Sequence, residues 1–312
     1  MLDRKLMVQV AKLYYEQGLT QQEIGKIIGV SRVTVSAILK ESRKRGIVNI
    51  QIIEKEPSSE SEMEVKLKER FGLKQAVVVQ CPPGPDELIV KGVAMAGARL
   101  LEEILREGDT LGCSWGRTLL QVAEMLHPQD KHVNVVQLNG GLGCISNDAS
   151  PSELARHIAQ TFGGSYYYLH APGIVENASV RNALLTDRSI RGTLERIRSV
   201  RVAACGIGSF VNSSLAQFGY LPTDFMESLR AKGIVGDICL RFFDIEGQIH
   251  DVLGDRIIGI TPADLEAVEI VIGVAGGTSK VEAIAGALRT GLLDICVTDT
   301  QTAQSVLSLG EG

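Results

Sequence analysis

No apolar run in this 312-residue sequence reaches the roughly 18 residues that a membrane-spanning helix needs. The six cysteines stand far apart, and no C-x-x-C pair is present that would suit structural zinc. The five histidines form no metal-binding spacing either, and we find no segment with the composition of a signal peptide. We therefore expect a cytoplasmic protein with reduced, mostly buried cysteines, no metal, no cofactor and no membrane partner.

Two common nucleotide-binding motifs are also missing. The sequence contains no G-x-x-x-x-G-K-[ST], which disfavours a P-loop nucleotide site. Gly206-Ile207-Gly208 has the first two glycines of a dinucleotide fingerprint, but Val211 stands where a third small residue is needed. NAD is therefore not expected as a cofactor.

The chain as a whole has no excess of positive charge, since its formal net charge is -5. The distribution is uneven, however. Residues 1–55 contain ten Lys and Arg and five Asp and Glu, a balance of +5, and the remainder carries -10. A local basic module can attract DNA without a basic isoelectric point, so the N-terminal segment is the candidate for a nucleic-acid contact.

The stretch from Thr20 to Arg45 has the pattern of a helix-turn-helix. Thr20 and Glu23 form a capping box, which predicts a helix from Gln21 to Ile28. Gly29 ends this helix, and Ser31 can cap a second helix that runs from Arg32 to about Lys44. Ile24, Ile27 and Ile28, followed by Val35, Ile38 and Leu39, are expected to give each helix one apolar face.

The outward strip of the second helix, formed by Arg32, Val33, Ser36 and Lys40, suits insertion into a major groove with its N-terminal end leading. The alternative is an ordinary helical hairpin with a solvated charged face, which the local positive charge disfavours. The predicted DNA-binding residues are Thr20, Gln21, Gln22, Ser31, Arg32, Val33, Thr34, Ser36 and Lys40.

Three further segments complete the first part of the chain. Residues 3–17 carry apolar residues at helical spacing and predict a supporting helix. Residues 47–53 alternate enough for a short strand, which would suit a winged variant although one strand does not establish a wing. After a charged, Ser-rich boundary, Met63, Leu67 and Phe71 mark one face of a linker helix that a partner subunit or the next domain can cover. The predicted domains are 1–54, a linker helix over 55–73, and 74–312.

From residue 74 onward, short apolar runs alternate with amphipathic helices. The expected strands are 76–80, 110–113, 133–138, 165–169, 202–205, 270–274 and 293–298. The expected helices are 86–106, 118–126, 152–162, 180–186, 223–232, 280–289 and 302–309. Repeated βα units of this kind indicate an α/β fold, with a mostly parallel, Rossmann-like, doubly wound sheet covered on both faces.

Ligands of such sheets bind beyond the carboxyl ends of the strands. Four Gly-rich loops follow the predicted strands, at 113–118, 139–141, 206–209 and 275–280. Each loop alone is equally explained by the needs of a tight turn, but together they suggest a site for a phosphate-sized anion. Arg117 and Lys280 can add full charges, with Ser114, Thr118, Thr278 and Ser279 as neutral donors.

A sugar attached to such an anion would need carboxylates or amides close to it. Asp237, Asp244 and Asn139 are the candidates. For Asp237, a purely structural role as a capping or turn carboxylate is about as good an explanation from the sequence alone.

The helix-turn-helix, followed in order by GCSWGRT, NGG, APGIV, GIGS, VGDICLRFFD and VAGGTSKVEAI, resembles the SorC family of bacterial transcription regulators over essentially the whole chain. The resemblance implies that the large domain is related to sugar-phosphate isomerases and glucosamine-phosphate deaminases. It also implies a phosphorylated sugar as effector, double-stranded operator DNA as partner, and a homo-oligomer, usually a tetramer.

The resemblance places phosphate against the loops matching 114–118 and 276–280, and a carboxylate that reaches sugar hydroxyls at Asp237. Family members with Lys at the position of Asn139 can form an imine with an aldehyde sugar; Asn139 excludes this and implies a reversible effector. The effector-binding residues expected are Ser114, Trp115, Gly116, Arg117, Thr118, Asn139, Gly140, Gly141, Gly206, Gly208, Asp237, Gly276, Gly277 and Lys280.

We therefore predict a transcriptional regulator of a carbohydrate-metabolism operon whose operator affinity depends on a phosphorylated sugar. The alternative is an isomerase- or deaminase-like enzyme with a DNA-binding head. That chemistry needs a poised base, and no loop offers a His–carboxylate pair at close spacing, so no catalytic residue is expected. A regulator of a neighbouring family with a different helix-turn-helix is disfavoured by the SWG and GDICLRFFD stretches.

Overall fold

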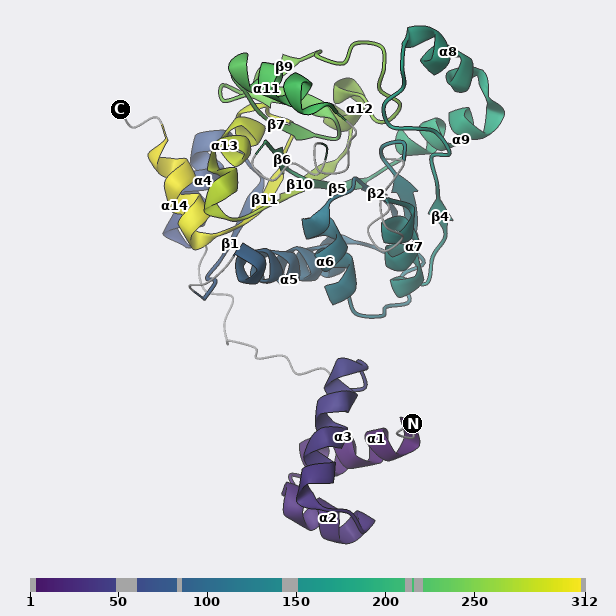
Figure 1. Cartoon of the computed structure of the whole chain (residues 1–312), viewed down its shortest axis with the longest axis vertical. Coiled ribbons are helices and arrows are strands. Elements are labelled where there is room, and N and C mark those ends of the chain that lie inside the picture. The colour runs from purple at the N-terminus through teal and green to yellow at the C-terminus, as the bar shows by residue number, and fades with distance from the viewer. Residues whose placement is uncertain are drawn as a thin grey trace. The chain divides into compact units, whose positions relative to one another are not determined.

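A computed structural model describes residues 4–48, 61–82, 86–141, 151–210, 215 and 221–309 (Figure 1). The chain divides into two compact units, Met1–Ser58 and Ser59–Gly312. The segment predicted as a linker helix contains α4 (Glu62–Phe71), which lies in the second unit. There Leu67 is buried in the core, and Met63 and Phe71 pack against the same core.

The first unit contains the predicted helix-turn-helix. Helix α2 spans Gln21–Ile28 and α3 spans Arg32–Lys44, so both predicted helices are confirmed. Thr20 Oγ1 accepts a hydrogen bond from the Glu23 backbone N–H at 3.3 Å, and the Glu23 carboxylate accepts one from the Thr20 N–H at 2.8 Å. The capping box thus satisfies two backbone donors at the start of α2 and fixes where the helix begins.

The corner between the two helices depends on glycine at two positions. Gly29 ends α2 in the left-handed conformation, with φ of 78°. Gly25 lies so close to the turn that a Cβ on it would be 2.7 Å from the Val30 carbonyl oxygen. Ser31 Oγ then accepts from the Thr34 N–H at 3.1 Å and starts α3. The short corner is possible because Gly25 has no side chain, so the Val30 carbonyl can occupy the space that a Cβ would need.

Three details of this unit differ from expectation or lie outside the structure. The first helix is interrupted, because α1 (Arg4–Ala11) continues as a π-helix, η1 (Lys12–Glu16). Ile27 was expected in the apolar face but is 59% exposed, since Ile24 and Ile28, four residues apart, take the buried side of α2. The predicted strand 47–53 lies outside the described residues except for 47 and 48, which form a bend.

The second unit is built on a seven-stranded parallel sheet with strand order β1-β11-β10-β5-β2-β3-β4. The strands are β1 (Gln75–Val79), β2 (Thr110–Cys113), β3 (Asn134–Gln137), β4 (Tyr166–Tyr167), β5 (Val202–Gly206), β10 (Ile270–Val274) and β11 (Ile295–Asp299). All seven predicted strands are confirmed, although β4 is only two residues long. Because every strand runs in the same direction, the loops after the strands gather at one edge of the sheet.

Helices cover both faces of this sheet (Figure 1). One face packs against α5 (Asp86–Ile104), α6 (Arg117–Met125) and α7 (Pro151–Thr161). The other packs against α4, α9 (Arg188–Ile197), α12 (Pro262–Glu266), α13 (Val281–Arg289) and α14 (Thr300–Ser308). Alternate residues of β5 serve the two cores: Val202 and Ala204 face the first group of helices, and Ala203 and Cys205 the second.

A second, four-stranded antiparallel sheet was not predicted. Its strands are β6 (Gly208–Ser209), β7 (Ile234–Ile238), β8 (Arg241–Asp244) and β9 (Ile249–His250), in that order. Helices α8 (Ala178–Thr186) and α11 (Thr223–Ala231) were predicted, whereas α9 and α12 were not. The β7–β8 turn has no Asn-Gly or Asp-Gly signal; Cys239 and Leu240 adopt positive φ there, which non-glycine residues rarely do.

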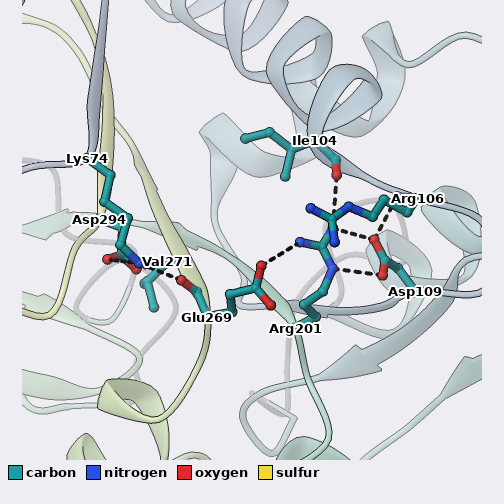
Figure 2. A network of polar contacts seen from close by, with 8 residues as sticks. All are labelled: Lys74, Ile104, Arg106, Asp109, Arg201, Glu269, Val271 and Asp294. Atoms are coloured by element: carbon teal, nitrogen blue, oxygen red, sulfur yellow. Dashed lines mark hydrogen bonds and ion pairs between the residues drawn. The ribbon is translucent and has the colours of Figure 1, made fainter.

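Charged residues connect the amino ends of the parallel strands (Figure 2). Arg201, just before β5, binds Asp109, just before β2, through Nε–Oδ1 and Nη2–Oδ2 distances of 2.8 and 2.5 Å. It also reaches Glu269, before β10, at 3.3 Å, and Lys74 lies 2.9 Å from Asp294. These contacts link the amino ends of the strands, which lie at the opposite edge of the sheet from the Gly-rich loops. The carboxyl ends of the strands are not involved and remain available for a ligand.

Candidate functional site

A cavity of about 320 Å³ lies beyond the carboxyl ends of β2, β5 and β10. Ten of the predicted effector-binding residues line it: Ser114, Trp115, Gly116, Arg117, Thr118, Gly206, Gly208, Asp237, Gly276 and Lys280. Asp86, Glu87 and Gln121 also line it and were not predicted. The topology therefore brings together loops that are far apart in sequence, as expected for a parallel sheet.

The loop after β2 places the N-terminus of α6 at the cavity. The Ser114 N–H continues the sheet by donating to the Ala204 carbonyl at 3.0 Å, while its hydroxyl accepts from the Gly206 N–H at 3.1 Å. Gly116, with φ of 140°, precedes α6, and the Leu120 N–H donates to the Gly116 carbonyl at 3.0 Å. The N–H groups before Leu120 have no acceptor within the helix, and the helix dipole favours an anion beside them.

Lys280 supplies a positive charge from the loop after β10. Its ammonium donates to the Ile207 carbonyl at 2.7 Å, which holds it beside the loop after β5. Burial, followed by repulsion from Arg117, lowers the pKa of Lys280 to about 8, with Asp237 acting in the opposite direction. The ammonium is therefore still mostly protonated at neutral pH but gives up its proton more readily than a solvated lysine.

Asp237 on β7 is the carboxylate of the cavity. Its Oδ2 accepts the Leu240 N–H at 3.1 Å, and a Cβ on Gly208 would come within 2.0 Å of its Oδ1. Burial raises the pKa of Asp237 to about 6, against the Leu240 N–H and the charge of Lys280, which lower it. Gly208 is thus required for this carboxylate to reach the cavity wall, and the carboxylate changes charge near neutral pH.

The Gly276–Gly277 loop is engaged inside the protein. The Gly277 N–H donates to Asp299 Oδ2 and to Thr302 Oγ1, each at 2.9 Å. A Cβ on Gly276 would lie 2.7 Å from the same Asp299 oxygen. The sequence suggested that this loop aims N–H groups at a ligand; the Gly277 N–H instead binds buried side chains, and Gly277 is not among the residues that line the cavity.

Asn139, Gly140 and Gly141 do not line the cavity either. Asn139 is fully buried, and its Nδ2 donates to the Cys239 carbonyl at 3.0 Å. Gly140 has no space for a side chain, because a Cβ would meet the Ala171 carbonyl oxygen at 2.6 Å. This loop therefore supports the cavity wall from behind, through Cys239, which does line it.

The predicted DNA-binding residues form the outer surface of α2 and α3. All nine are exposed except Gln21, which is half-buried. Val33 is 77% exposed at the start of α3. Thr20, Ser31 and Thr34 take part in the caps of α2 and α3, so their hydroxyls also position the two helices.

Comparison with known proteins identifies the family. The family model described as "Putative sugar-binding domain" matches residues 55–308, and the one described as "Sigma-70, region 4" matches residues 8–45. The full-length sorbitol operon regulator SorC from Klebsiella pneumoniae superposes with a TM-score of 0.78 at 31% identity, covering 99% of this chain and 100% of that one. The chain belongs to the SorC family of transcription regulators.

Other transcription regulators also resemble this chain. The deoxyribonucleoside regulator of Bacillus subtilis (strain 168) is 32% identical over 308 residues, covering 98% of each chain. A DeoR family transcriptional regulator from Listeria monocytogenes is 28% identical with a TM-score of 0.72, over 78% of this chain and 98% of that one. These relatives are regulators, and the protein is a DNA-binding transcription regulator rather than an enzyme.

Among the described residues, no helix is both long and apolar enough to cross a bilayer. Within the same residues, no group of three or more His, Cys, Asp or Glu side chains is arranged to hold a metal ion.

Proposed function

We propose that this regulator controls a carbohydrate-metabolism operon and that a phosphorylated sugar, bound reversibly in the cavity at the carboxyl ends of β2, β5 and β10, sets its affinity for operator DNA. One observation carries the proposal. The start of α6, Arg117 and Lys280 meet Asp237 in a single cavity of a chain that also carries a helix-turn-helix. Hydrogen-bond donors that can bind an anion lie beside a carboxylate that can accept hydrogen bonds from hydroxyl groups. These two features match the phosphate and the sugar of a sugar phosphate.

The phosphate is assigned to the N-terminal end of α6. The helix dipole favours an anion there, and Arg117 and Lys280 add charge-assisted hydrogen bonds. Asp237 accepts a hydrogen bond from a sugar hydroxyl. The position of Asn139 holds no lysine and its amide is bound to Cys239, so imine formation at that position does not occur and the effector leaves by simple dissociation.

The exposed strip of α3 is assigned to base recognition in the major groove of operator DNA. Arg32 can bind a guanine edge through two hydrogen bonds, and the exposed Val33 suits a thymine methyl group. Lys40, about two turns further along the same strip of α3, suits a phosphate contact. We propose that the protein acts in the cytoplasm as a homo-oligomer, a dimer or a tetramer, on paired half-sites.

Control follows from linkage between the two sites. The effector must bind one arrangement of the paired subunits better than the other, because a ligand with equal affinity for both shifts nothing. A coupling free energy of about 1–3 kcal/mol changes operator affinity by roughly 5- to 150-fold.

The test combines two measurements on the full-length protein. A thermal-shift screen of phosphorylated pentoses, hexoses and polyols, each beside its unphosphorylated sugar, identifies the effector; gel-shift titration of promoter DNA from the adjoining operon then measures its effect. We expect at least one phosphorylated compound, and not its sugar, to raise the melting temperature and change operator affinity. If no phosphorylated sugar does either, the proposal is wrong.

A further inference from the structure

We propose that the effector cavity takes a sugar that carries one phosphate and discriminates against sugar bisphosphates. The inference rests on the proposed function and deepens it, because it specifies the class of effector. It follows from the way that hydrogen-bond donors and charges are divided between the two glycine-containing sides of the cavity.

Only one side of the cavity, among the residues described, is equipped for a phosphate. That side contains the start of α6, with the positive end of its helix dipole, and the two cationic side chains Arg117 and Lys280. Arg117 is close enough to Lys280 to lower its pKa, so the two charges act on the same region. A single phosphate bound there would be attracted by both cations and would offset their mutual repulsion.

The Gly276–Gly277 turn, at the start of the loop that also carries Lys280, does not provide a second phosphate site. The Gly277 N–H is already bound by Asp299 and Thr302. The carboxyl group of Asp86 lies at this loop as well, with its atoms 3.8–3.9 Å from the place where a Cβ on Gly277 would be. A phosphate here would lose the Gly277 donor and meet a negative charge instead.

The charges around the cavity lead to the same conclusion. The described side chains that line it include two cations, Arg117 and Lys280, and three acids, Asp86, Glu87 and Asp237. The stretches that adjoin lining residues in the sequence, 83–85 and 211–220, contain no Lys or Arg. A second phosphate would add about two further negative charges opposite these acids, and like charges repel one another.

The three acids instead suit a neutral, hydroxyl-rich part of the ligand. Ionised carboxylates are acceptors only, and each can take hydrogen bonds from more than one hydroxyl. Asp86 and Glu87 come from the exposed start of α5, and Asp237 comes from β7. The polar residues of the cavity thus form an anion side and a hydroxyl side.

Isothermal titration of the full-length protein with matched pairs tests the inference. The pairs are fructose 6-phosphate with fructose 1,6-bisphosphate, glucose 6-phosphate with glucose 1,6-bisphosphate, and ribose 5-phosphate with ribose 1,5-bisphosphate. In every pair that binds, we expect the monophosphate to bind at least about tenfold more tightly. A bisphosphate that binds as well as its monophosphate overturns the inference and leaves the proposed function standing. If no phosphorylated sugar binds, either in these pairs or in the thermal-shift screen, both fail.

A variant separates charge from shape. In Asp86→Asn combined with Glu87→Gln, the ratio of the bisphosphate and monophosphate dissociation constants should shrink several-fold, because the repulsion is removed while the side-chain size is kept. Glu124→Gln, on the exposed side of α6 and outside the cavity, is the matched control and should leave the ratio unchanged. An unchanged ratio in the double variant would show that these acids do not select against the second phosphate.

Discussion

The side-chain ammonium of Lys280 donates a 2.7 Å hydrogen bond to the backbone carbonyl of Ile207. This contact joins the loop after β10 to the loop after β5, across two neighbouring strands of the sheet. The lysine is thus positioned before any anion arrives, and little side-chain entropy remains to be lost on binding. Such preorganisation is what a charged effector contact requires.

We predict that Lys280→Met weakens effector binding and leaves operator affinity without effector intact. A hydrogen bond to a charged group contributes about 1.5–3 kcal/mol, so the dissociation constant should rise by roughly 10- to 150-fold. Titration calorimetry measures the first quantity and gel-shift the second. Lys232→Met, at an exposed position at the end of α11, is the control. A collapse of operator binding in Lys280→Met would make this lysine structural.

Effector affinity should be greatest between about pH 6 and pH 8. Burial raises the pKa of Asp237 to about 6, so the acceptor for sugar hydroxyls is ionised only above that pH. The pKa of Lys280 is lowered to about 8 by burial and by Arg117, so its positive charge declines above that pH. Dissociation constants measured from pH 5 to 9 should rise at both ends.

The rise of the dissociation constant above pH 8 is the diagnostic part of this profile, because the phosphate of the effector itself titrates near pH 6 and contributes to the rise at low pH. In Lys280→Met the rise above pH 8 should disappear, while the acid limb remains. An affinity of the wild-type protein that stays constant from pH 7 to 9 would contradict the assignment of Lys280 to the anion.

Local signals were sufficient to predict the helix-turn-helix and the framework of the sheet. A hydroxyl at Thr20 and a carboxylate at Glu23 satisfy specific backbone donors, so both the start and the type of α2 are fixed by neighbouring residues. The parallel strands are apolar on both faces, which makes their runs visible in the sequence. Ten residues that were predicted from the sequence line one cavity at the carboxyl ends of these strands.

Contacts between distant segments decided what the sequence left open. The Gly277 N–H binds Asp299, 22 residues away, and the Asn139 amide binds the Cys239 carbonyl, 100 residues away. No local pattern distinguishes these uses of a glycine loop from ligand binding. The acids Asp86 and Glu87 were missed for a related reason: the start of α5 lies at the cavity through the tertiary arrangement of the strands, which no local pattern shows.

We predict that Arg32→Ala reduces the preference for operator over random DNA. Arg32 is exposed at the first position of α3, where recognition helices contact base edges. Loss of a base contact should cost about 1–3 kcal/mol on the operator and much less on random sequence. Competition gel-shift with both DNAs measures the difference. An equal loss on both would identify a phosphate contact instead.

Gly25→Ala should destabilise the N-terminal unit selectively. Its Cβ would lie 2.7 Å from the Val30 carbonyl oxygen, a backbone atom that can move only if the corner between α2 and α3 opens. Overpacking of this kind typically costs 1–3 kcal/mol, so operator binding should fall while effector binding persists. The control is Gly192→Ala in α9, where a Cβ would meet nothing within 4 Å and should instead stabilise slightly. Equal operator affinity in wild type and Gly25→Ala would show that the corner tolerates a side chain.

Arg201→Met should destabilise the large unit by about 3–5 kcal/mol at neutral pH. The substitution leaves Asp109 without its guanidinium partner (Figure 2). The side chains of Arg201 and Asp109 are only 16% and 10% exposed, so water cannot fully replace the lost contact. Burial acts to raise the pKa of Asp109, but the hydrogen bonds from Arg201 and from the Arg106 N–H outweigh it and leave that pKa lowered.

A lowered folded-state pKa means that the stabilisation is complete above the unfolded value of about 3.9 and is lost as the pH falls through the folded value. The difference in unfolding free energy between wild type and Arg201→Met, measured in urea, should therefore be constant from pH 7 to about 5 and shrink towards pH 3. Arg198→Met is the control: that arginine is 71% exposed and lies 3.5 Å from Asp264, so its loss should cost at most about 1 kcal/mol. A difference for Arg201→Met as small as the control's, at pH 7, would show that the strands do not depend on this pair.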